Sequence, residues 1–202
     1  MTARHLEVLV EEESMEALLS SLLPRLVPGL SVAIRRFQGK HDLLSKLPQR
    51  MQGYRKTLQP GSRIIVVVDR DNDDCHKLKR DLEGDAAAAG LRTRTAVGTS
   101  DWEVANRIAV EELEAWYFGD WSAVRAAYPL LSESVPRKSR YRDPENIRGG
   151  TWEAFERVLQ GRGYFKSGLR KVEAATEIAQ HLSLQGNRCL SFEHFVAAVQ
   201  EV

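Results

Sequence analysis

The chain has 202 residues, of which 43% are hydrophobic and 28% are charged, and this composition is typical of a globular protein with one domain and an appendage, or with two small domains. Lys and Arg total 29 and Asp and Glu total 28, so a net charge of +1 gives no support by itself for nucleic-acid binding. The two cysteines, Cys75 and Cys189, lie too far apart to indicate a disulfide framework or a zinc site.

The first part of the chain alternates short apolar runs with helical patterns. This alternation predicts an α/β fold, with a mostly parallel sheet flanked by helices on both faces. Strands are expected at 6–10, 30–37, 64–68, 91–97 and 106–110. Helices are expected from Ser14 to a stop at Pro24, over 42–54 with an interruption near Pro48, and from a cap at Asp73 or Asp74 to Ala89.

The pattern changes after Gly119. Helices are expected from a cap at Asp120 to Tyr128, over 152–160 after a cap at Thr151, beyond Gly168, and from a cap at Ser191 to 199, with a basic loop at 132–150. We therefore predict an α/β domain over 1–119 and a helical extension over 120–202 that packs on it. Residues 136–175 contain ten basic and five acidic residues, a charge of +5, which fits a solvated surface and a phosphate-facing patch equally well.

Three clusters of acidic residues follow predicted strands, at 11–13, 69–74 and 111–114. Open α/β sheets bind their ligands at the carboxyl ends of the strands, so the three clusters can converge on one point. Two like charges about 4 Å apart repel by about 4 kcal/mol at an effective dielectric of about 20, so a cation, a proton or solvent must relieve them. A divalent metal with oxygen ligands is the favoured candidate, and a capped, solvated loop is the alternative for any single cluster.

The Asp-x-Asp pattern at 69–71 has several known uses. A calcium loop that starts at Asp69 is excluded, because Asp74 stands where glycine is required and Arg80 stands where a glutamate is required. A phosphatase of the haloacid-dehalogenase type, with Asp69 as the nucleophile and Asp71 as the acid, stays open.

Two known families resemble this chain. Val-Glu at 10–11 after the first strand and Val-Asp-Arg-Asp at 68–71 are similar to the Toprim domain of topoisomerases, primases and overcoming-lysogenization-defect nucleases, although Glu12 stands where Toprim domains often have glycine. Asn-Arg-Ile-Ala-Val-Glu-Glu-Leu-Glu-Ala-Trp at 106–116 and Gly-Gly-Thr-Trp-Glu-Ala-Phe-Glu at 149–156 resemble the bacterial family called domain of unknown function 4276, over nearly the whole chain. The resemblance implies a Toprim-like (Rossmann-like) fold, Mg²⁺-dependent phosphodiester chemistry, and association with ATPases in phage defence.

The resemblance also implies roles for particular residues. Glu11, Asp69 and Asp71 are the candidate catalytic residues and Mg²⁺ ligands, with Mn²⁺ as an alternative ion. Asp73, Glu112 and Glu114 are further candidate metal ligands. Independently of the resemblance, the turn at Gly39 and the basic segment 136–175 give the candidates for contact with nucleic-acid phosphates: Lys40, Lys138, Arg140, Lys166 and Lys171.

Three functions follow from these assignments. The first is a Mg²⁺-dependent nuclease with nucleic acid as its partner, the second is a non-catalytic Toprim-like subunit of an ATPase, and the third is the phosphatase. The amino terminus, Met-Thr-Ala-Arg-His-Leu-Glu, has no apolar signal core, and no apolar run approaches the roughly 18 residues of a membrane span. We therefore expect a cytoplasmic protein with no membrane association.

Overall fold

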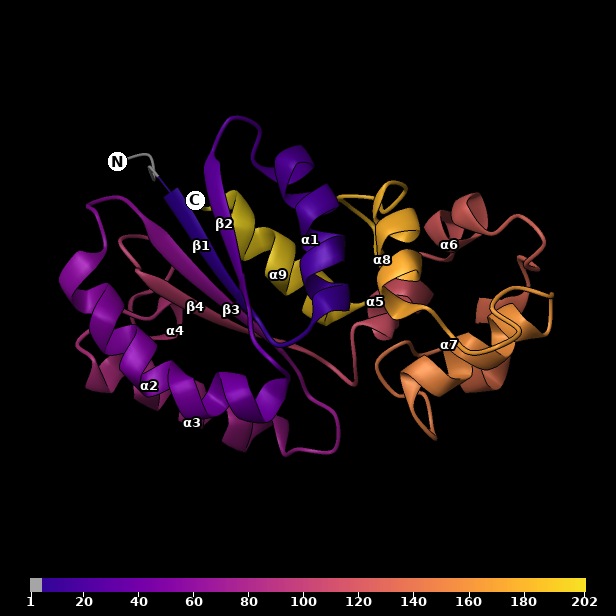
Figure 1. Cartoon of the computed structure of the whole chain (residues 1–202), viewed down its shortest axis with the longest axis horizontal. Helices are drawn as coiled ribbons and strands as arrows, with labels where there is room; N and C mark the ends of the chain where they lie inside the picture. The colour runs from indigo at the N-terminus through magenta and orange to yellow at the C-terminus, as the bar shows by residue number, and fades with distance from the viewer. Residues whose placement is uncertain (1–4) are drawn as a thin grey trace.

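The computed structural model describes residues 5–202, so the first four residues of the amino terminus, for which no signal core is expected, lie outside the described part. Its centre is a sheet of four parallel strands in the order β2-β1-β3-β4 (Figure 1). The strands are β1 (His5–Val10), β2 (Ser31–Arg36), β3 (Arg63–Asp69) and β4 (Val104–Ala109). The predicted α/β class with a parallel sheet is therefore confirmed.

Strand β3 lies inside the sheet because its residues suit burial on both faces. The β-branched side chains from Ile64 to Val68 are all fully buried. Successive side chains point to opposite faces, and accordingly Ile65 and Val67 belong to one hydrophobic cluster while Val66 and its alternating neighbours belong to another. Asp69 ends this strand and is thereby held at the edge of the sheet where a ligand site is expected.

Helices cover both faces of the sheet (Figure 1). One face packs against α2 (Lys40–Thr57) and α3 (Cys75–Ala88), which bury leucines such as Leu43 and Leu82. The other face packs against α1 (Glu13–Leu26) and α9 (Leu190–Gln200). Because α9 comes from the end of the chain, one face of the sheet is covered in part by residues that follow the helical region.

The helical region lies at one end of the sheet and shares a hydrophobic core with it. Its helices are α5 (Glu114–Gly119), α6 (Trp121–Ala127), α7 (Thr151–Gln160) and α8 (Lys171–Ala179), with short 3₁₀ turns at Val135–Arg137 and Ser139–Tyr141. Helix α8 packs along α1, and buried rings such as Trp116 and Phe155 continue the core from the sheet outward. The division of the chain at residue 119 stays a prediction. No helix within residues 5–202 has both the length and the apolar character needed to cross a bilayer.

The predicted strand at 91–97 is wrong. Only Thr93 makes a strand-like bridge, to Val104, and the next residues form the short helix α4 (Arg94–Val97). The Thr93 hydroxyl accepts a hydrogen bond from the Ala96 backbone N–H at 3.3 Å, and Gly98 then ends the turn with a φ of 77°. This local capping chemistry turns the chain away from the sheet after a single bridge.

Several predicted helix ends are also wrong. Pro24 and Pro48 lie inside α1 and α2, and neither proline ends or interrupts its helix. Proline loses one backbone hydrogen bond in a helix, but the apolar faces of both helices are buried against the sheet and keep them continuous. The expected caps Ser14, Thr151 and Ser191 instead lie within the first helical turns.

Candidate functional site

Three carboxylates from separate parts of the chain are buried at the carboxyl end of the sheet. Glu11 directly follows β1, Asp69 ends β3, and Glu114 begins α5. Their exposed fractions are 5%, 6% and 1%, respectively. The backbone N–H of Asp69 donates a hydrogen bond to Glu11 Oε1 at 2.8 Å. Because β1 and β3 are adjacent parallel strands, the fold brings these acids together as predicted from the positions of the acidic clusters.

Each of the three acids has an oxygen atom without a hydrogen-bond partner among the described residues: Glu11 Oε2, Asp69 Oδ1 and Glu114 Oε2. Burial raises the pKa of Glu11 to about 7 and that of Glu114 to about 7. Burial also raises the pKa of Asp69 well above its usual range, and the charges of Glu11 and Glu114 add to this effect. A buried carboxylate without a partner needs a proton or a cation, so this group of acids is suited to receive one.

Tyr117 lies with the same buried acids, although it is not among the site residues predicted from the sequence. Its hydroxyl is buried and has no hydrogen-bond partner within residues 5–202. Burial raises the pKa of Tyr117 well above 10, and the negative charges of Glu114 and Asp69 raise it further. The spacing of three residues from Glu114 along α5 places both side chains on one helix face, which is the signal that would have identified it.

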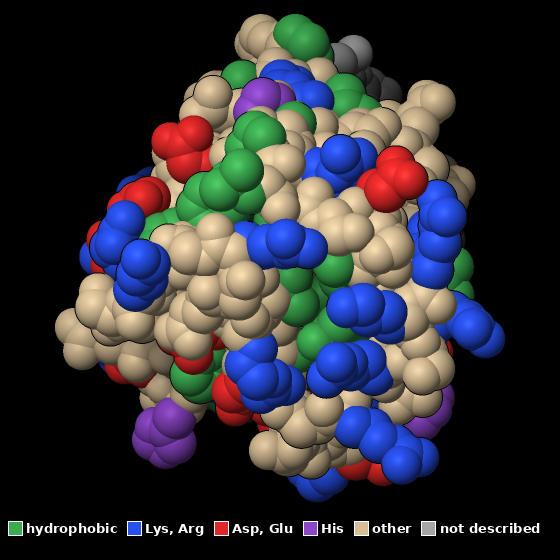
Figure 2. Space-filling model, turned by 90° about the vertical axis from the view of Figure 1, so that its right-hand side faces the viewer, with side chains coloured by type: hydrophobic (Ala, Val, Ile, Leu, Met, Phe, Trp, Pro, Cys, Tyr) green, Lys and Arg blue, Asp and Glu red, His purple; other side chains and the backbone are tan. Residues whose placement is uncertain are grey.

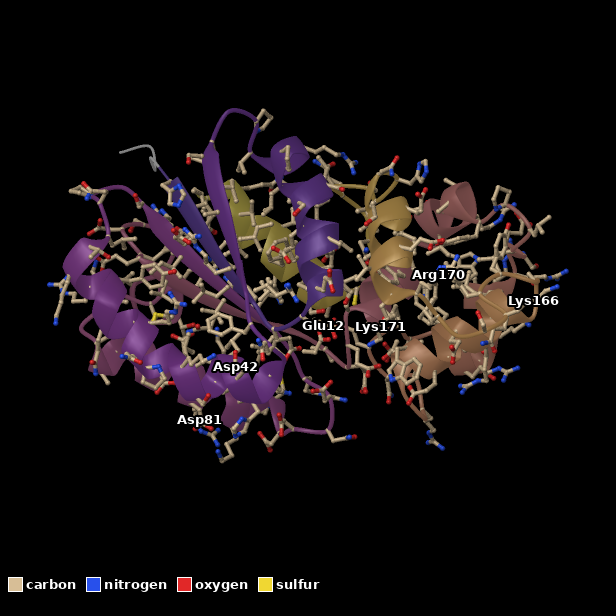
Figure 3. All side chains as sticks on the ribbon, in the orientation of Figure 1. Glu12, Asp42, Asp81, Lys166, Arg170 and Lys171 are labelled. Atoms are coloured by element: carbon tan, nitrogen blue, oxygen red, sulfur yellow. The ribbon has the colours of Figure 1, made fainter. Side chains whose placement is uncertain are left out.

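Lys171, at the start of α8, is the cation on the helical side of the acids. Its Nζ lies 3.9 Å from Glu12 Oε1 and 3.9 Å from Glu114 Oε1, and Figure 3 shows Lys171 and Glu12 adjacent between the sheet and the helical region. Burial opposes its charge, but Glu114 and Glu12 outweigh this effect and raise the pKa of Lys171. The ammonium also lies 5.3 Å from the ring centroid of Trp152. Lys171 is therefore charged and in a position to meet an anion beside the acids.

Lys40 occupies the other side, over the loop that follows β3. Its Nζ donates hydrogen bonds to the carbonyl oxygens of Asp69 and Arg70 at 2.6 and 2.8 Å. It also forms ion pairs with Asp71 at 3.1 Å and Asp73 at 2.7 Å. Asp71 and Asp73 are thus at the rim, with 45% and 54% of their side chains exposed, rather than among the buried acids. In this arrangement Lys40 organises the loop and is fully engaged by its own chain.

The loops after β3 and β4 are joined to each other in an unusual backbone conformation. Asp71 and Glu111 both have positive φ values, 51° and 64°, which non-glycine residues seldom adopt. The Asp71 backbone N–H donates to the Glu111 carbonyl at 2.8 Å, and the Arg70 guanidinium pairs with the Glu111 carboxylate. These contacts fix the rim of the site at some cost in backbone strain.

Glu112, a predicted metal ligand, contacts the start of α7. One of its carboxylate oxygens accepts hydrogen bonds from the backbone N–H groups of Thr151 and Trp152, both at 2.9 Å. A carboxylate at this position satisfies two unpaired N–H groups and interacts favourably with the helix dipole. Glu112 therefore attaches α7 to the end of β4.

A cleft of about 710 Å³ opens between the rim and the start of α7, lined by Asp71, Glu112 and Trp152 among others. None of the five candidates for phosphate contact lines this cleft. Lys138 and Arg140 line a separate cleft in the helical region, and Lys166 lies at the far end of that region (Figure 3).

The acids suit a hard divalent cation in their chemistry. Carboxylate oxygens are preferred ligands of Mg²⁺ and Mn²⁺, and Mg²⁺ keeps several waters, so two or three carboxylates suffice. The oxygens without partners on Glu11 and Asp69 are available for this purpose. Within residues 5–202, however, no three His, Cys, Asp or Glu side chains form a ready metal-binding group. A cation would therefore be held by few protein oxygens plus water, or after side-chain adjustment.

Comparisons with known proteins bear on the family. No curated protein matches the chain in sequence. Among solved structures, the chain is similar to the C-terminal region of the OLD protein of Xanthomonas campestris pv. campestris, with 15% sequence identity and a TM-score of 0.42 over 98% of this chain and 94% of that one. The model of the family described as domain of unknown function (DUF4276) matches residues 10–200. Because this match spans nearly the whole chain, the protein belongs to the DUF4276 family, which confirms the resemblance found in its sequence.

Proposed function

We propose that this protein is a Mg²⁺-dependent phosphodiesterase that hydrolyses nucleic acid at the carboxyl end of its sheet. The observation that carries the proposal is the group of buried acids, Glu11, Asp69 and Glu114, each with an oxygen atom that lacks a partner among the described residues. The similarity of the segments 10–11 and 68–71 to Toprim domains supports the same chemistry.

Glu11 and Asp69 are the residues that would hold the cation, with Asp71 at the rim as a third candidate. When bound, Mg²⁺ would supply Lewis-acid polarisation of the phosphodiester and a more acidic water. Asp71 is paired with Lys40 at 3.1 Å, so its participation would require the ion pair to open. Asp73, which pairs with the same lysine at 2.7 Å, would be affected in the same way.

Two further side chains have properties that phosphodiester hydrolysis requires. Glu114, with a pKa raised by burial to about 7, exchanges a proton readily at neutral pH and is suited to general acid–base work. Lys171 lies 3.9 Å from Glu114, too far for a strong direct hydrogen bond, so its ammonium is available to a phosphate group. We assign Lys171 to contact with the substrate phosphate and Glu114 to proton exchange.

The other two functions stay predictions. No contact within the described residues favours a phosphatase with Asp69 as nucleophile. The hydrogen bond from the Asp69 backbone N–H to the Glu11 carboxylate supports a site shared by both acids rather than an isolated nucleophile. An ATPase partner has no identified docking surface on this part of the chain.

The proposal is tested by replacing Asp69 with Asn. We expect Mn²⁺ binding, measured by titration calorimetry, and hydrolysis of plasmid DNA and of single-stranded DNA and RNA to fall by about a hundredfold or more, since even residues that only support a metal ligand contribute 10- to 100-fold. Asp81→Asn is the matched control, because Asp81 lies on α3, is more than half exposed, and among residues 5–202 pairs only with Lys77 (Figure 3).

The control should bind Mn²⁺ and hydrolyse as the unmodified protein does. If Asp69→Asn and Glu11→Gln both hydrolyse nucleic acid at the rate of Asp81→Asn, the buried acids are not the active site and the proposal fails.

A further inference from the structure

A second cleft, separate from the buried acids, is lined by positive charge. It has a volume of about 270 Å³, and its charged lining residues are Lys138, Arg140, Arg157 and Arg162, with no acidic residue among those that line it. Figure 2, which looks onto the helical end of the molecule, shows several Lys and Arg side chains gathered around an exposed apolar patch. We call this feature the basic cleft.

The charges of the basic cleft are not balanced by the protein itself. None of its four cations forms an ion pair with any of residues 5–202. Glu133, close by in the chain, is engaged by Arg125 at 3.8 Å and by Arg137 at 3.7 Å instead. Four like charges around one small cleft repel each other and raise the local concentration of anions. A multiply charged anion is the ligand that would relieve this repulsion.

The cleft is built on anchored loops. The carbonyl of Ser132 accepts a hydrogen bond from Trp121 Nε1 at 2.9 Å, and the carbonyl of Leu131 accepts one from Arg125 Nε at 3.1 Å. Tyr141 is buried, stacks on the ring of Phe118 at 5.2 Å, and carries the Arg140 guanidinium 5.1 Å from its own ring centroid. These contacts hold the backbone of the cleft and the Arg140 side chain in place before any ligand arrives, which reduces the entropy cost of binding.

Helix α7 connects the basic cleft to the buried acids. Glu112 binds the first N–H groups of α7 next to the acids, whereas Arg157 and Gly161, at its other end, line the basic cleft. A helix of 10 residues is about 15 Å long at 1.5 Å per residue. One strand of a nucleic-acid duplex carries a phosphate about every 3.4 Å of rise, so about four nucleotides span this helix.

We propose that the basic cleft binds phosphates of the nucleic-acid strand about four nucleotides away from the phosphodiester at the buried acids. The charge of the cleft supports binding to a polyanion by itself, and only the spacing rests on the proposed function. Phosphate contacts of this kind position a strand without reading its sequence, so the cleft would serve strand placement rather than sequence selection.

Binding without hydrolysis is the first test. The double variant Lys138→Gln, Arg162→Gln is compared with Lys56→Gln, Arg80→Gln, which removes the same charge from α2 and α3, where Lys56 and Arg80 are exposed and form no ion pair within the described residues. Affinity for labelled DNA and RNA oligonucleotides of about 16 nucleotides is measured by fluorescence anisotropy in chelator over a salt series. The cleft variant should lose about tenfold or more in affinity and about two units of the salt-dependence slope, whereas the control should match the unmodified protein.

Equal affinities and slopes for the two double variants would overturn the proposal. It would also be overturned if the cleft variant lost binding only to vesicles that contain anionic lipid and kept its affinity for oligonucleotides. Because these measurements contain no metal, they stand whether or not the protein hydrolyses nucleic acid.

Hydrolysis tests the spacing. The cleft variant should raise the KM for a long oligonucleotide and leave the KM for a trinucleotide unchanged, since a trinucleotide at the acids does not reach the cleft. A KM that rises equally for both substrates would overturn the spacing of about four nucleotides, while the chelator experiment would still decide whether the cleft binds.

Discussion

The two ends of helix α7 lie in opposite electrostatic surroundings. At its N-terminal end, Glu11, Asp69 and Glu114 are buried with oxygen atoms that lack partners among residues 5–202. At its other end, Lys138 and three arginines line a cleft with no acidic lining residue. The net charge of +1 therefore conceals two unbalanced sets of charges. One set is suited to a cation and the other to an anion, which agrees with the proposed Mg²⁺-dependent hydrolysis of nucleic acid.

The two regions also differ in how they are held in place. The acids are attached to the ends of sheet strands, and the hydrogen bond of 2.8 Å from the Asp69 backbone N–H to Glu11 Oε1 fixes two of them to each other. The cations are attached to loops and to the end of a helix. Both regions nevertheless share one hydrophobic core, in which Trp116 packs against Phe192 and Phe195 of α9 at centroid distances of 5.2 and 5.3 Å. We therefore expect them to unfold together.

The largest expected effect tests this shared core. Trp116→Ala removes a fully buried ring and the hydrogen bond from its Nε1 to Ser191 Oγ at 3.0 Å. We expect the free energy of unfolding to fall by about 3–5 kcal/mol, as measured by urea denaturation. Circular dichroism and fluorescence should report one common transition. Leu130→Ala, at a side chain with 65% exposure, is the control and should change stability by about 0.5 kcal/mol or less. Two separate transitions would show that the regions fold independently.

Local chemistry was a good guide wherever a single segment decides the structure. The β-branched run before Asp69 predicts a buried strand, and Asp74 and Asp120 cap α3 and α6 as their positions suggested. The prediction fails where distant packing decides. Pro24 and Pro48 stay helical because their helices are buried against the sheet. The error at 91–97 has a local cause instead, since the Thr93 cap begins α4 directly after one bridge to β4.

The site divides in the same way. Glu11, Asp69 and Glu114 could be grouped from sequence because parallel strands end at one edge. The contacts of Glu112 with Thr151 and Trp152 could not be foreseen, since they depend on where a helix almost forty residues later returns to the sheet. The ion pairs of Lys40 with the rim acids depend likewise on how the loop after β3 folds back on α2.

A second prediction uses the raised pKa of Glu114. Its pKa is about 4.5 when unfolded and about 7 when folded, because burial disfavours the charge. The folded state therefore holds the proton more tightly, and the stability that this gives is present below about pH 4.5 and is lost as the pH rises to about 7. A shift of this size corresponds to about 3 kcal/mol. In chelator, Glu114→Gln should reduce the loss of stability between about pH 4.5 and pH 7 by up to this amount.

Urea denaturation at several pH values measures this effect. Glu177→Gln, on the exposed side of α8, is the matched control and should keep the pH dependence of the unmodified protein. If Glu114→Gln and the control lose stability in parallel as the pH rises, Glu114 does not hold a proton in the folded protein. The acids near the N-terminal end of α7 would then lack fewer positive charges than the comparison with the basic cleft suggests.

The smallest expected effect concerns the join between the two regions. Glu112→Ala removes the carboxylate that accepts from the Thr151 and Trp152 N–H groups, both at 2.9 Å. The loss of a helix cap costs about 1 kcal/mol, so we expect a small decrease in stability and faster hydrogen exchange in the first turn of α7. Glu112→Gln keeps an acceptor oxygen and should lose less in both measurements.

Mn²⁺ affinity of the same two variants separates the role of Glu112 as a cap from the predicted role as a metal ligand. A cap supports the site only indirectly, so Glu112→Gln should keep most of the affinity, whereas a ligand would lose affinity in both variants. If hydrogen exchange in α7 is unchanged and Mn²⁺ affinity falls in both, then Glu112 belongs to the metal site. Helix α7 would in that case be positioned by its packing on α5 rather than by the carboxylate at its N-terminal end.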